Sequence, residues 1–343
     1  MFKKIKSKSM AFLLAMTLLT GCSPTSLSTN SSIAASTSSN DNSILEFNAQ
    51  ENIVIGTVRH GPAAQPEYAE DGITPLPLEY SGGTLTIPYK ASVEGLSVDI
   101  GFLVFWDGVP VAYDVGEGTD VSYLHTFSQT EGEELEFSIR FMPTGNAGET
   151  HTITFASIYN PYYKPDMKSS SGYGAYHNML CCSRSVYLTV SPDDTTPNEA
   201  SASIHDFTVA QEELTHHFIK DELSAFYGCE ELTMEELDKT VRFAEFIDGT
   251  AVFDNYLLKE DPVTIDFCLF GTDGKEYAVT FFVDHKPAFE TQLLTVEKGM
   301  VTRLSVSIDP SEIEQSATIY FIAVPLDSDG YAEKSSSILL YKQ

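Results

Sequence analysis

Alternation of apolar and polar residues is the main pattern along the chain after residue 45. In the stretch GGTLTIPYKA, the residues Leu85, Ile87 and Tyr89 fall on one face of an extended strand, and in VYLTV so do Val186, Leu188 and Val190. Similar short runs rich in Val, Ile, Thr, Tyr and Phe recur between turn residues. A period of two is typical of strands with one buried face. The pattern therefore predicts an all-β protein built of sandwiches.

One stretch, residues 233–241, has helical character instead. Thr233 and Glu236 have the spacing of a capping box, which predicts a short amphipathic helix after Thr233. His216 and His217 lie in a strand-like run, where neighbouring side chains point to opposite faces of a sheet. Two such side chains cannot bind one ion together, so we expect no metal site there.

The same strand pattern occurs twice. The segments FLVFWDGVPVAY, residues 102–113, and VTFFVDHKPAF, residues 279–289, share an apolar run, then Asp, then Pro, so that Asp107 matches Asp284. Further along, FSIRFMP is matched by LSVSIDP, and THTITFASIYNP by SATIYFIAVP. The common order and spacing of these landmarks predict two tandem domains of one architecture.

The repeat bears on whether Trp106 and Asp107 form a chemical site or a turn. Trp106 is the only tryptophan, and Val283 stands in its place in the second copy. An Asp-Gly pair between apolar runs favours a type I′ hairpin turn, because both residues tolerate positive φ. We therefore interpret Trp106 and Asp107 as structural, with the indole in the core or at the edge of the first sandwich. The segment FIDGTAVF, residues 246–253, predicts another such turn.

The first 22 residues have the order of a secretory signal. Four lysines precede an apolar run, residues 11–19, that is too short to span a bilayer. The run ends in Leu19-Thr20-Gly21-Cys22, which is similar to the lipobox of bacterial lipoproteins, in which the Cys sulfur is diacylated and the chain is cut before it. The resemblance implies lipidation of Cys22, and with it a lipid-anchored protein on the extracytoplasmic face of the cell membrane.

These features give an order of segments. The tether and the linker are rich in small polar residues and lack large aromatic side chains, so that they cannot form a core. We expect a signal peptide at 1–21, a lipidated, disordered Ser/Thr-rich tether at 22–44, a β-sandwich domain at 45–191, a linker at 192–202 and a second β-sandwich domain at 203–343. Tandem sandwiches on a lipid tether resemble the immunoglobulin-like modules of bacterial surface lipoproteins, although the antibody-type Cys, Trp, Cys spacing is missing.

Charge and motifs exclude several functions. The formal net charge is −29, and removal of the signal peptide takes away lysines and no acids. Such a chain repels phosphate backbones, so we expect no nucleic-acid partner. Neither a Walker loop, a His-Glu-x-x-His helix nor a Gly-x-Ser-x-Gly elbow occurs. The sequence DSDG, residues 327–330, with Glu333 lacks the third oxygen ligand of a calcium loop and is interpreted as a turn. We expect no cofactor and a non-catalytic protein.

One long loop, residues 159–178, carries five tyrosines with glycines and prolines. Tyrosine can stack on a flat apolar face while its hydroxyl forms a hydrogen bond, and long loops are often functional. The candidate ligand-binding residues are Tyr159, Tyr162, Tyr163, Tyr173, Tyr176 and His177.

Three functions stay open for this loop and for the chain. The first is a surface binding module for an envelope glycan or peptide. The second is a structural spacer or interaction subunit of an envelope assembly, in which the rings seal the sandwich or its contact with the second domain. The third is an enzyme with an unrecognised site.

Four cysteines follow Cys22, namely Cys181, Cys182, Cys229 and Cys268. Adjacent Cα atoms lie about 3.8 Å apart, below the usual disulfide range of roughly 4.4 to 6.8 Å, so a bridge between Cys181 and Cys182 is not expected. If a disulfide forms, we expect it between Cys229 and Cys268, both in the second domain; free thiols are the alternative.

Overall fold

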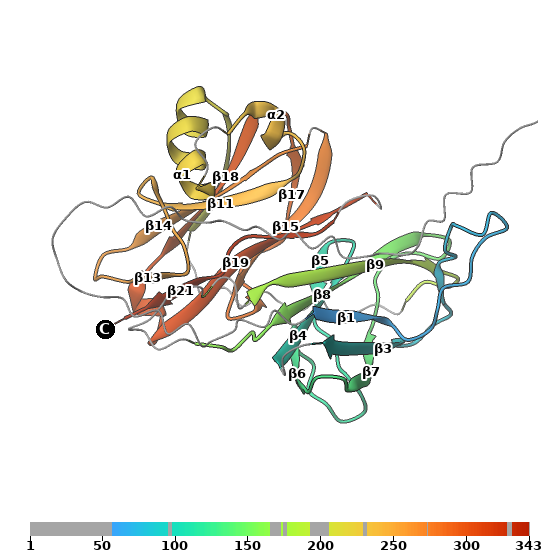
Figure 1. Ribbon diagram of the computed structural model, residues 1–343. Coiled ribbons are helices and arrows are strands. Elements are labelled where there is room, and N and C mark those ends of the chain that lie inside the picture. Colours follow the sequence, from blue (N-terminus) through green and yellow to red (C-terminus); the bar gives the residue numbers. More distant parts are fainter. Residues whose placement is uncertain are drawn as a thin grey trace, which may run out of the picture. The chain divides into compact units, whose positions relative to one another are not determined.

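The alternating segments are strands in the computed structural model of the chain (Figure 1). The structure describes residues 57–94, 98–164, 173, 177–192, 206–228, 232–272, 274–327 and 331–342. The fold is all-β and consists of two tandem immunoglobulin-like β-sandwiches, as predicted. The signal peptide, Cys22, the tether and nearly all of the linker lie outside the described residues.

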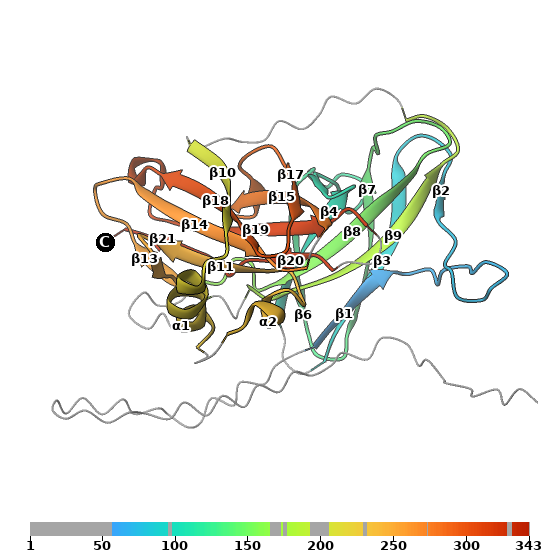
Figure 2. The ribbon, with the colours of Figure 1, turned by 90° about the horizontal axis from the view of Figure 1, so that it is seen from above.

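The first sandwich consists of a three-stranded and a six-stranded sheet. The strand orders are β1-β3-β7 and β2-β9-β8-β4-β5, with β6 beside β4, and Figure 2 shows β4, β8 and β9 side by side. In β3 every second side chain is buried, including Leu85, Ile87 and Tyr89. The strands are β1 (Thr57–Pro62), β2 (Leu78–Tyr80), β3 (Leu85–Glu94), β4 (Val98–Trp106), β5 (Val109–Val111), β6 (His125–Gln129), β7 (Glu134–Phe141), β8 (Thr150–Tyr159) and β9 (Met179–Leu188).

The second sandwich consists of a five-stranded and a seven-stranded sheet. The strand orders are β10-β18-β14-β11-β12 and β13-β21-β19-β15-β16, with β17 beside β15 and β20 beside β19. The strands are β10 (Asp206–Glu213), β11 (Arg242–Ile247), β12 (Thr250–Ala251), β13 (Asn255–Leu257), β14 (Val263–Phe270), β15 (Lys275–Val283), β16 (Lys286–Pro287), β17 (Gln292–Val296), β18 (Met300–Ile308), β19 (Ser316–Pro325), β20 (Glu333–Lys334) and β21 (Ile338–Tyr341).

Short helical segments cover the outer face of the five-stranded sheet (Figure 1). Phe218, Leu223 and Leu237 pack there against Phe246 and Phe270. The segments are a π-helical turn η2 (Phe218–Leu223), α1 (Ser224–Tyr227) and α2 (Met234–Leu237), and a 3₁₀ turn η3 (Pro310–Glu312) follows β18. Among the described residues, no helix has the length and apolar character needed to cross a membrane.

The helical predictions are confirmed in part. Thr233 and Glu236 form the capping box, with the Glu236 backbone N–H donating to Thr233 Oγ1 at 3.3 Å. The helix is shorter than the predicted stretch 233–241, because the chain turns at residues 238–240, ahead of β11. The strand-like interpretation of His216 and His217 is wrong, since both lie at the start of a helical turn. The apolar residues that follow them pack as a helix on the sheet below.

The internal repeat is confirmed strand by strand. The strands β3 to β8 correspond in order to β14 to β19. Each sandwich ends in a strand that pairs antiparallel with the last of these, β9 with β8 and β21 with β19. In both copies a short strand, β2 or β13, runs parallel to that last strand. The three turns predicted at Asp107, Asp248 and Asp284 are present, and each of these aspartates has a positive φ.

A buried seam joins the two sandwiches. The outer faces of β4 and β8 meet those of β15 and β19, so that the repeat-equivalent residues Phe105 and Phe282 contact each other with ring centroids 6.2 Å apart. The β4–β5 turn reaches across the seam, because a Cβ built on Gly108 would lie 2.4 Å from Ala278 Cβ. Each sandwich thus uses the same surface to bind the other, as in a twofold-symmetric dimer.

Candidate functional site

The tyrosine loop divides into exposed and buried residues. Tyr162 and Tyr163 are 63% and 38% exposed, whereas Tyr173 is 1% exposed and His177 is fully buried. Tyr159 is partly buried at the end of β8, and its hydroxyl accepts a hydrogen bond from the Val58 backbone at 2.8 Å. Tyr176 lies outside the described residues. The sequence grouped these side chains together, but the structure gives them different surroundings.

The buried part of the loop packs against the second sandwich. The Tyr173 hydroxyl lies 2.6 Å from Thr318 Oγ1 of β19. His285, in the β15–β16 turn, lies with Nε2 2.5 Å from the Pro161 carbonyl oxygen and Nδ1 2.9 Å from the Tyr320 hydroxyl. Burial lowers the pKa of His285 to about 4, so the imidazole is neutral at pH 7. Its Nε2–H therefore donates to the carbonyl, and Nδ1 accepts from Tyr320.

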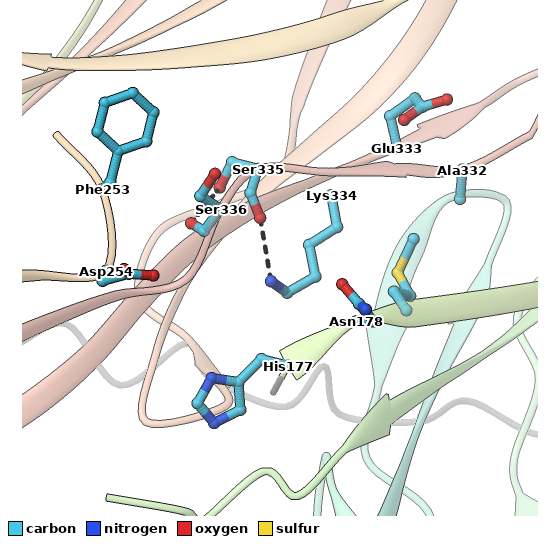
Figure 3. Close-up of a pocket in the computed structure, with 10 residues that line it drawn as sticks. His177, Asn178, Phe253, Asp254, Ala332, Glu333, Lys334, Ser335 and Ser336 are labelled. Atoms are coloured by element: carbon cyan, nitrogen blue, oxygen red, sulfur yellow. Dashed lines mark hydrogen bonds between the residues drawn. The ribbon is translucent and has the colours of Figure 1, made fainter. Parts of the chain in front are cut away.

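A polar pocket of about 440 Å³ opens beside this contact and is shared by the two sandwiches (Figure 3). This volume is in the usual range of small-molecule sites, roughly 300 to 1,000 Å³. The first sandwich contributes the start of β9, and the second contributes β20 with the segment that follows it and the loop before β13. The lining residues are His177, Asn178, Met179, Phe253, Asp254, Ala332, Glu333, Lys334, Ser335 and Ser336.

Lys334 is the basic residue of the pocket. Its Nζ donates to the Ser335 carbonyl at 3.0 Å and to Ser337 Oγ at 2.8 Å, and it lies 4.6 Å from the centre of the Tyr320 ring. Burial lowers the pKa of Lys334 to about 7, although the nearby carboxylate of Glu245 opposes the shift. The amine is therefore held in one place, in surroundings that disfavour its charged form.

One glutamate, Glu245, lies near this lysine, and a second, Glu333, lies on the opposite face of β20. Glu333 lines the pocket, but its side chain points away from Lys334 (Figure 3), and burial raises its pKa to about 7. Glu245 is fully buried behind the segment after β20, where its Oε1 accepts from the Ser336 backbone N–H at 2.7 Å while Oε2 has no hydrogen-bond partner among the described residues. Burial raises the pKa of Glu245 to about 7 as well. Glu245 is the carboxyl group whose charge acts on Lys334.

His177 closes the side of the pocket that belongs to the first sandwich. Its ring nitrogens face the carbonyl groups of Asn160 and Pro161 without a hydrogen bond of good geometry. Burial, followed by the charge of Lys334 and the neighbouring His285, lowers its pKa to about 3. The ring packs edge-on against Tyr173, with centroids 4.5 Å apart. His177 is thus a neutral wall residue at pH 7.

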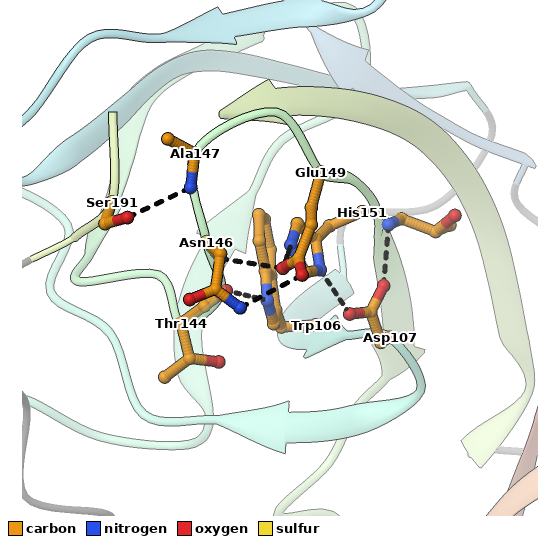
Figure 4. Close-up of polar contacts among 9 residues, drawn as sticks. Trp106, Asp107, Thr144, Asn146, Ala147, Glu149, His151 and Ser191 are labelled. Carbon is orange, nitrogen blue, oxygen red and sulfur yellow. Dashed lines mark hydrogen bonds and ion pairs between the residues drawn. The ribbon is translucent and has the colours of Figure 1, made fainter. Parts of the chain in front are cut away.

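The structural interpretation of Trp106 and Asp107 is confirmed (Figure 4). Trp106 is buried in the first core, stacks on His151 at 4.9 Å and donates from Nε1 to the Thr144 carbonyl at 3.0 Å. Asp107 Oδ1 accepts from the Thr152 backbone N–H at 2.8 Å. In the second copy, Asp284 Oδ1 accepts from Thr318 in the same way at 2.9 Å. The repeated aspartate thus attaches each turn to the neighbouring strand of the sheet, β8 in the first sandwich and β19 in the second.

The cysteines add no bridge among the described residues. Cys181, Cys182 and Cys268 form no disulfide with one another. Cys181 packs at the seam, whereas Cys182 packs against the first core, because neighbours in β9 point to opposite faces. Cys229 lies outside the described residues, so a disulfide between Cys229 and Cys268 stays a prediction. No group of three His, Cys, Asp or Glu side chains within the described ranges has the arrangement of a metal site.

Sequence reasoning missed Glu245, Glu333 and Lys334 as site residues. A signal was present for Glu245, because the strand RFAEFI places it on the same face as Phe243 and Ile247, where an apolar residue is expected. A charged residue in such a position is uncommon unless it has a partner. Lys334 gave no comparable signal, since a lysine beside serines is typical of a solvated turn.

Known proteins resemble the chain only remotely. No protein-family model matches it, and no curated protein is significantly similar. A crystal structure of a protein of unknown function from Porphyromonas gingivalis W83 aligns with 11% identity over 83% of this chain and 99% of its own, with a TM-score of 0.22. The tandem Ig repeats of Dlar give 11% identity, 84% and 97% coverage and a TM-score of 0.18. The C-terminal domain of the Streptococcus pyogenes antigen I/II-family protein AspA aligns with 8% identity over 84% of this chain and 100% of its own, with a TM-score of 0.19. These TM-scores are too low to support an argument, so the assignment of the fold rests on the strand order of the sheets.

Proposed function

We propose that the chain is a non-catalytic binding protein of the cell envelope, held by a lipid on Cys22, that takes up part of an envelope glycan or peptide in the pocket between its two sandwiches. The pocket carries this proposal, because it gathers fixed hydrogen-bonding groups from both sandwiches around a cavity of about 440 Å³. Concave sites with a few converging polar groups are the usual ligand sites of proteins. The lipobox and signal pattern support the location.

A pocket-filling substitution tests this function. Asn178 lines the pocket at an exposed position outside the seam core, so Asn178→Trp places an indole where the ligand would lie. The fragment 45–343 should bind isolated envelopes, and Asn178→Trp should abolish this binding. Val121→Trp, at an exposed position that does not line the pocket, serves as control. Equal binding by both variants, with unchanged unfolding midpoints, would show that the pocket is not the binding site.

A second function, that of a rigid spacer or interaction subunit, is favoured by the burial of Tyr173 and His177 in the seam. In that case the loop stiffens the joint between the sandwiches rather than binding a ligand. The same assay separates the two functions, because a protein that binds partners through its outer surface tolerates Asn178→Trp. Loosening the seam should then weaken binding instead.

A further inference from the structure

We infer that the ligand of this pocket is a saccharide, which lies with one ring face on Phe253 and forms hydrogen bonds through its hydroxyl groups to Asp254 and Lys334. This inference rests on the proposed function and names the ligand class for the same site. It depends on three features: an exposed aromatic ring that is held in place, a mixture of hydrogen-bond donors and acceptors, and the scarcity of apolar surface in the pocket.

The aromatic ring is Phe253, which lines the pocket and is 50% exposed. A single exposed phenylalanine is ordinary, but this one is fixed. Its ring stacks on Phe226 with centroids 4.9 Å apart and an interplanar angle of 27°. Phe226 packs in turn on the buried Phe246. A rigid apolar plate at the edge of a polar pocket (Figure 3) is suited to cover the C–H face of a sugar ring at little entropic cost.

The hydrogen-bonding groups of the pocket match hydroxyls better than they match any single charge. Asp254 brings a carboxyl group, and Lys334 and Asn178 bring N–H donors. In its ammonium form Lys334 has three N–H bonds, and among the described residues it donates to two acceptors. A hydroxyl group donates and accepts at once. Neighbouring hydroxyls of one sugar can therefore bond to a carboxyl oxygen and to the lysine together.

The charge of the pocket argues against a strongly ionic ligand. Asp254 and Lys334 bring groups of opposite sign to the pocket, and burial disfavours the charged form of Lys334 by lowering its pKa to about 7. An anion would lie beside Asp254, and a cation would lie beside Lys334. A neutral polyhydroxylated ligand meets neither repulsion.

A peptide fits less well, because peptide sites use an apolar or aromatic anchor inserted into a desolvated pocket. Here the apolar lining is confined to Phe253, Met179 and Ala332, and the other lining residues are polar or charged. No deep apolar slot is formed by residues that line the pocket. The observations therefore favour a sugar over a side chain.

The test is calorimetric titration of the whole chain in detergent with soluble trisaccharides of glucose, mannose, xylose and N-acetylglucosamine, and with a Gly/Ser-rich and a Leu/Phe-rich peptide. We expect at least one trisaccharide to bind. Phe253→Ala should weaken that binding by about ten-fold or more, as expected for the loss of one ring that stacks on the ligand. Phe253→Tyr keeps the ring and should restore binding. Tyr68→Ala, which removes a comparably exposed ring that does not line the pocket, should have no effect.

Lys334→Met tests the hydrogen-bonding half of the site. It keeps the length of the side chain but removes the donor, so it should weaken trisaccharide binding while the unfolding midpoint is followed in parallel. Peptide binding that is blocked by Asn178→Trp, without any saccharide binding, overturns the inference and leaves the proposed function intact. Saccharide binding that is insensitive to Phe253→Ala and Lys334→Met also overturns the inference. Envelope binding that survives Asn178→Trp overturns the proposed function itself.

Discussion

At the scale of single residues, identical side chains have different roles according to their position relative to the seam. Tyr173 lies buried against the second sandwich and is hydrogen-bonded to Thr318, whereas Tyr162, in the same loop, is mostly exposed. The loop is thus partly a joint between the sandwiches and partly a surface. Among the described tyrosines of the loop, Tyr162 and Tyr163 are exposed and thus available for direct contact with a ligand.

This difference predicts unequal costs of substitution. Tyr173→Ala should lower the free energy of unfolding by about 3 kcal/mol or more, since it removes a buried ring and leaves the Thr318 hydroxyl without this partner. Tyr162→Ala should change it by no more than about 0.5 kcal/mol. Urea unfolding followed by circular dichroism measures both values. Equal effects of the two substitutions would contradict the burial of Tyr173.

At the scale of elements, the Asp-Gly hairpin turn is used twice in different surroundings. Gly108 and Gly249 both follow an Asp and have φ of 79° and 70°. A Cβ on Gly108 would meet Ala278 Cβ at 2.4 Å, whereas a Cβ on Gly249 would have no neighbour within 4 Å. The first turn therefore needs glycine for both conformation and contact, and the second turn needs it for conformation alone.

The two glycines form a matched pair for experiment. Gly249→Ala should cost about 1 kcal/mol, which is the penalty of placing an L-residue at positive φ. Gly108→Ala should cost about 3 kcal/mol in total, because the added methyl group also pushes the two sandwiches apart. Thermal unfolding of both variants gives the comparison. If the costs are the same, the β4–β5 turn does not press on β15 in solution.

At the scale of the whole molecule, the seam gathers groups whose protonation is linked to stability. Burial lowers the pKa of His285 to about 4 and that of His177 to about 3. Because the unfolded chain binds these protons more readily, stability is lost as the pH falls from about 6.5 towards these values. Glu245 and Glu333, with pKa values raised to about 7, act in the opposite direction between about pH 7 and 4.5. The net loss should therefore steepen below about pH 4.5.

A histidine variant isolates this effect. For His285, a pKa of about 4 corresponds to a loss of up to roughly 3 kcal/mol on acidification. His285→Gln should thus be less stable than the wild type at pH 7, but should lose less stability between pH 6.5 and 4. His216→Gln, at an exposed position, serves as control. Urea unfolding at the two pH values gives the loss of stability for each protein. Equal losses in the wild type and in His285→Gln would show that protonation of His285 does not destabilise the fold.

Attachment to the membrane is also a property of the whole molecule. We predict that Cys22→Ala abolishes acylation and releases the chain from membranes or leaves its signal uncleaved, because the thiol is the acyl acceptor. Incorporation of labelled palmitate, together with fractionation of the cells, measures this outcome. Cys181→Ala, which keeps the lipobox, should be acylated normally. A membrane-bound and normally processed Cys22→Ala chain would contradict the lipobox interpretation.

The sequence by itself determined the features that depend on near neighbours. The strands followed from a period of two, as in β3, and the Asp turns followed from residues that tolerate positive φ. The repeat was legible because equivalent strands must bury equivalent faces. Only the tertiary structure decided the seam, the burial of Tyr173 and His177, and the pocket around Lys334. These features join residues that lie more than a hundred positions apart, such as Tyr173 with Thr318. Local periodicity shows that a side chain faces inwards or outwards, but it does not show which distant surface the side chain meets.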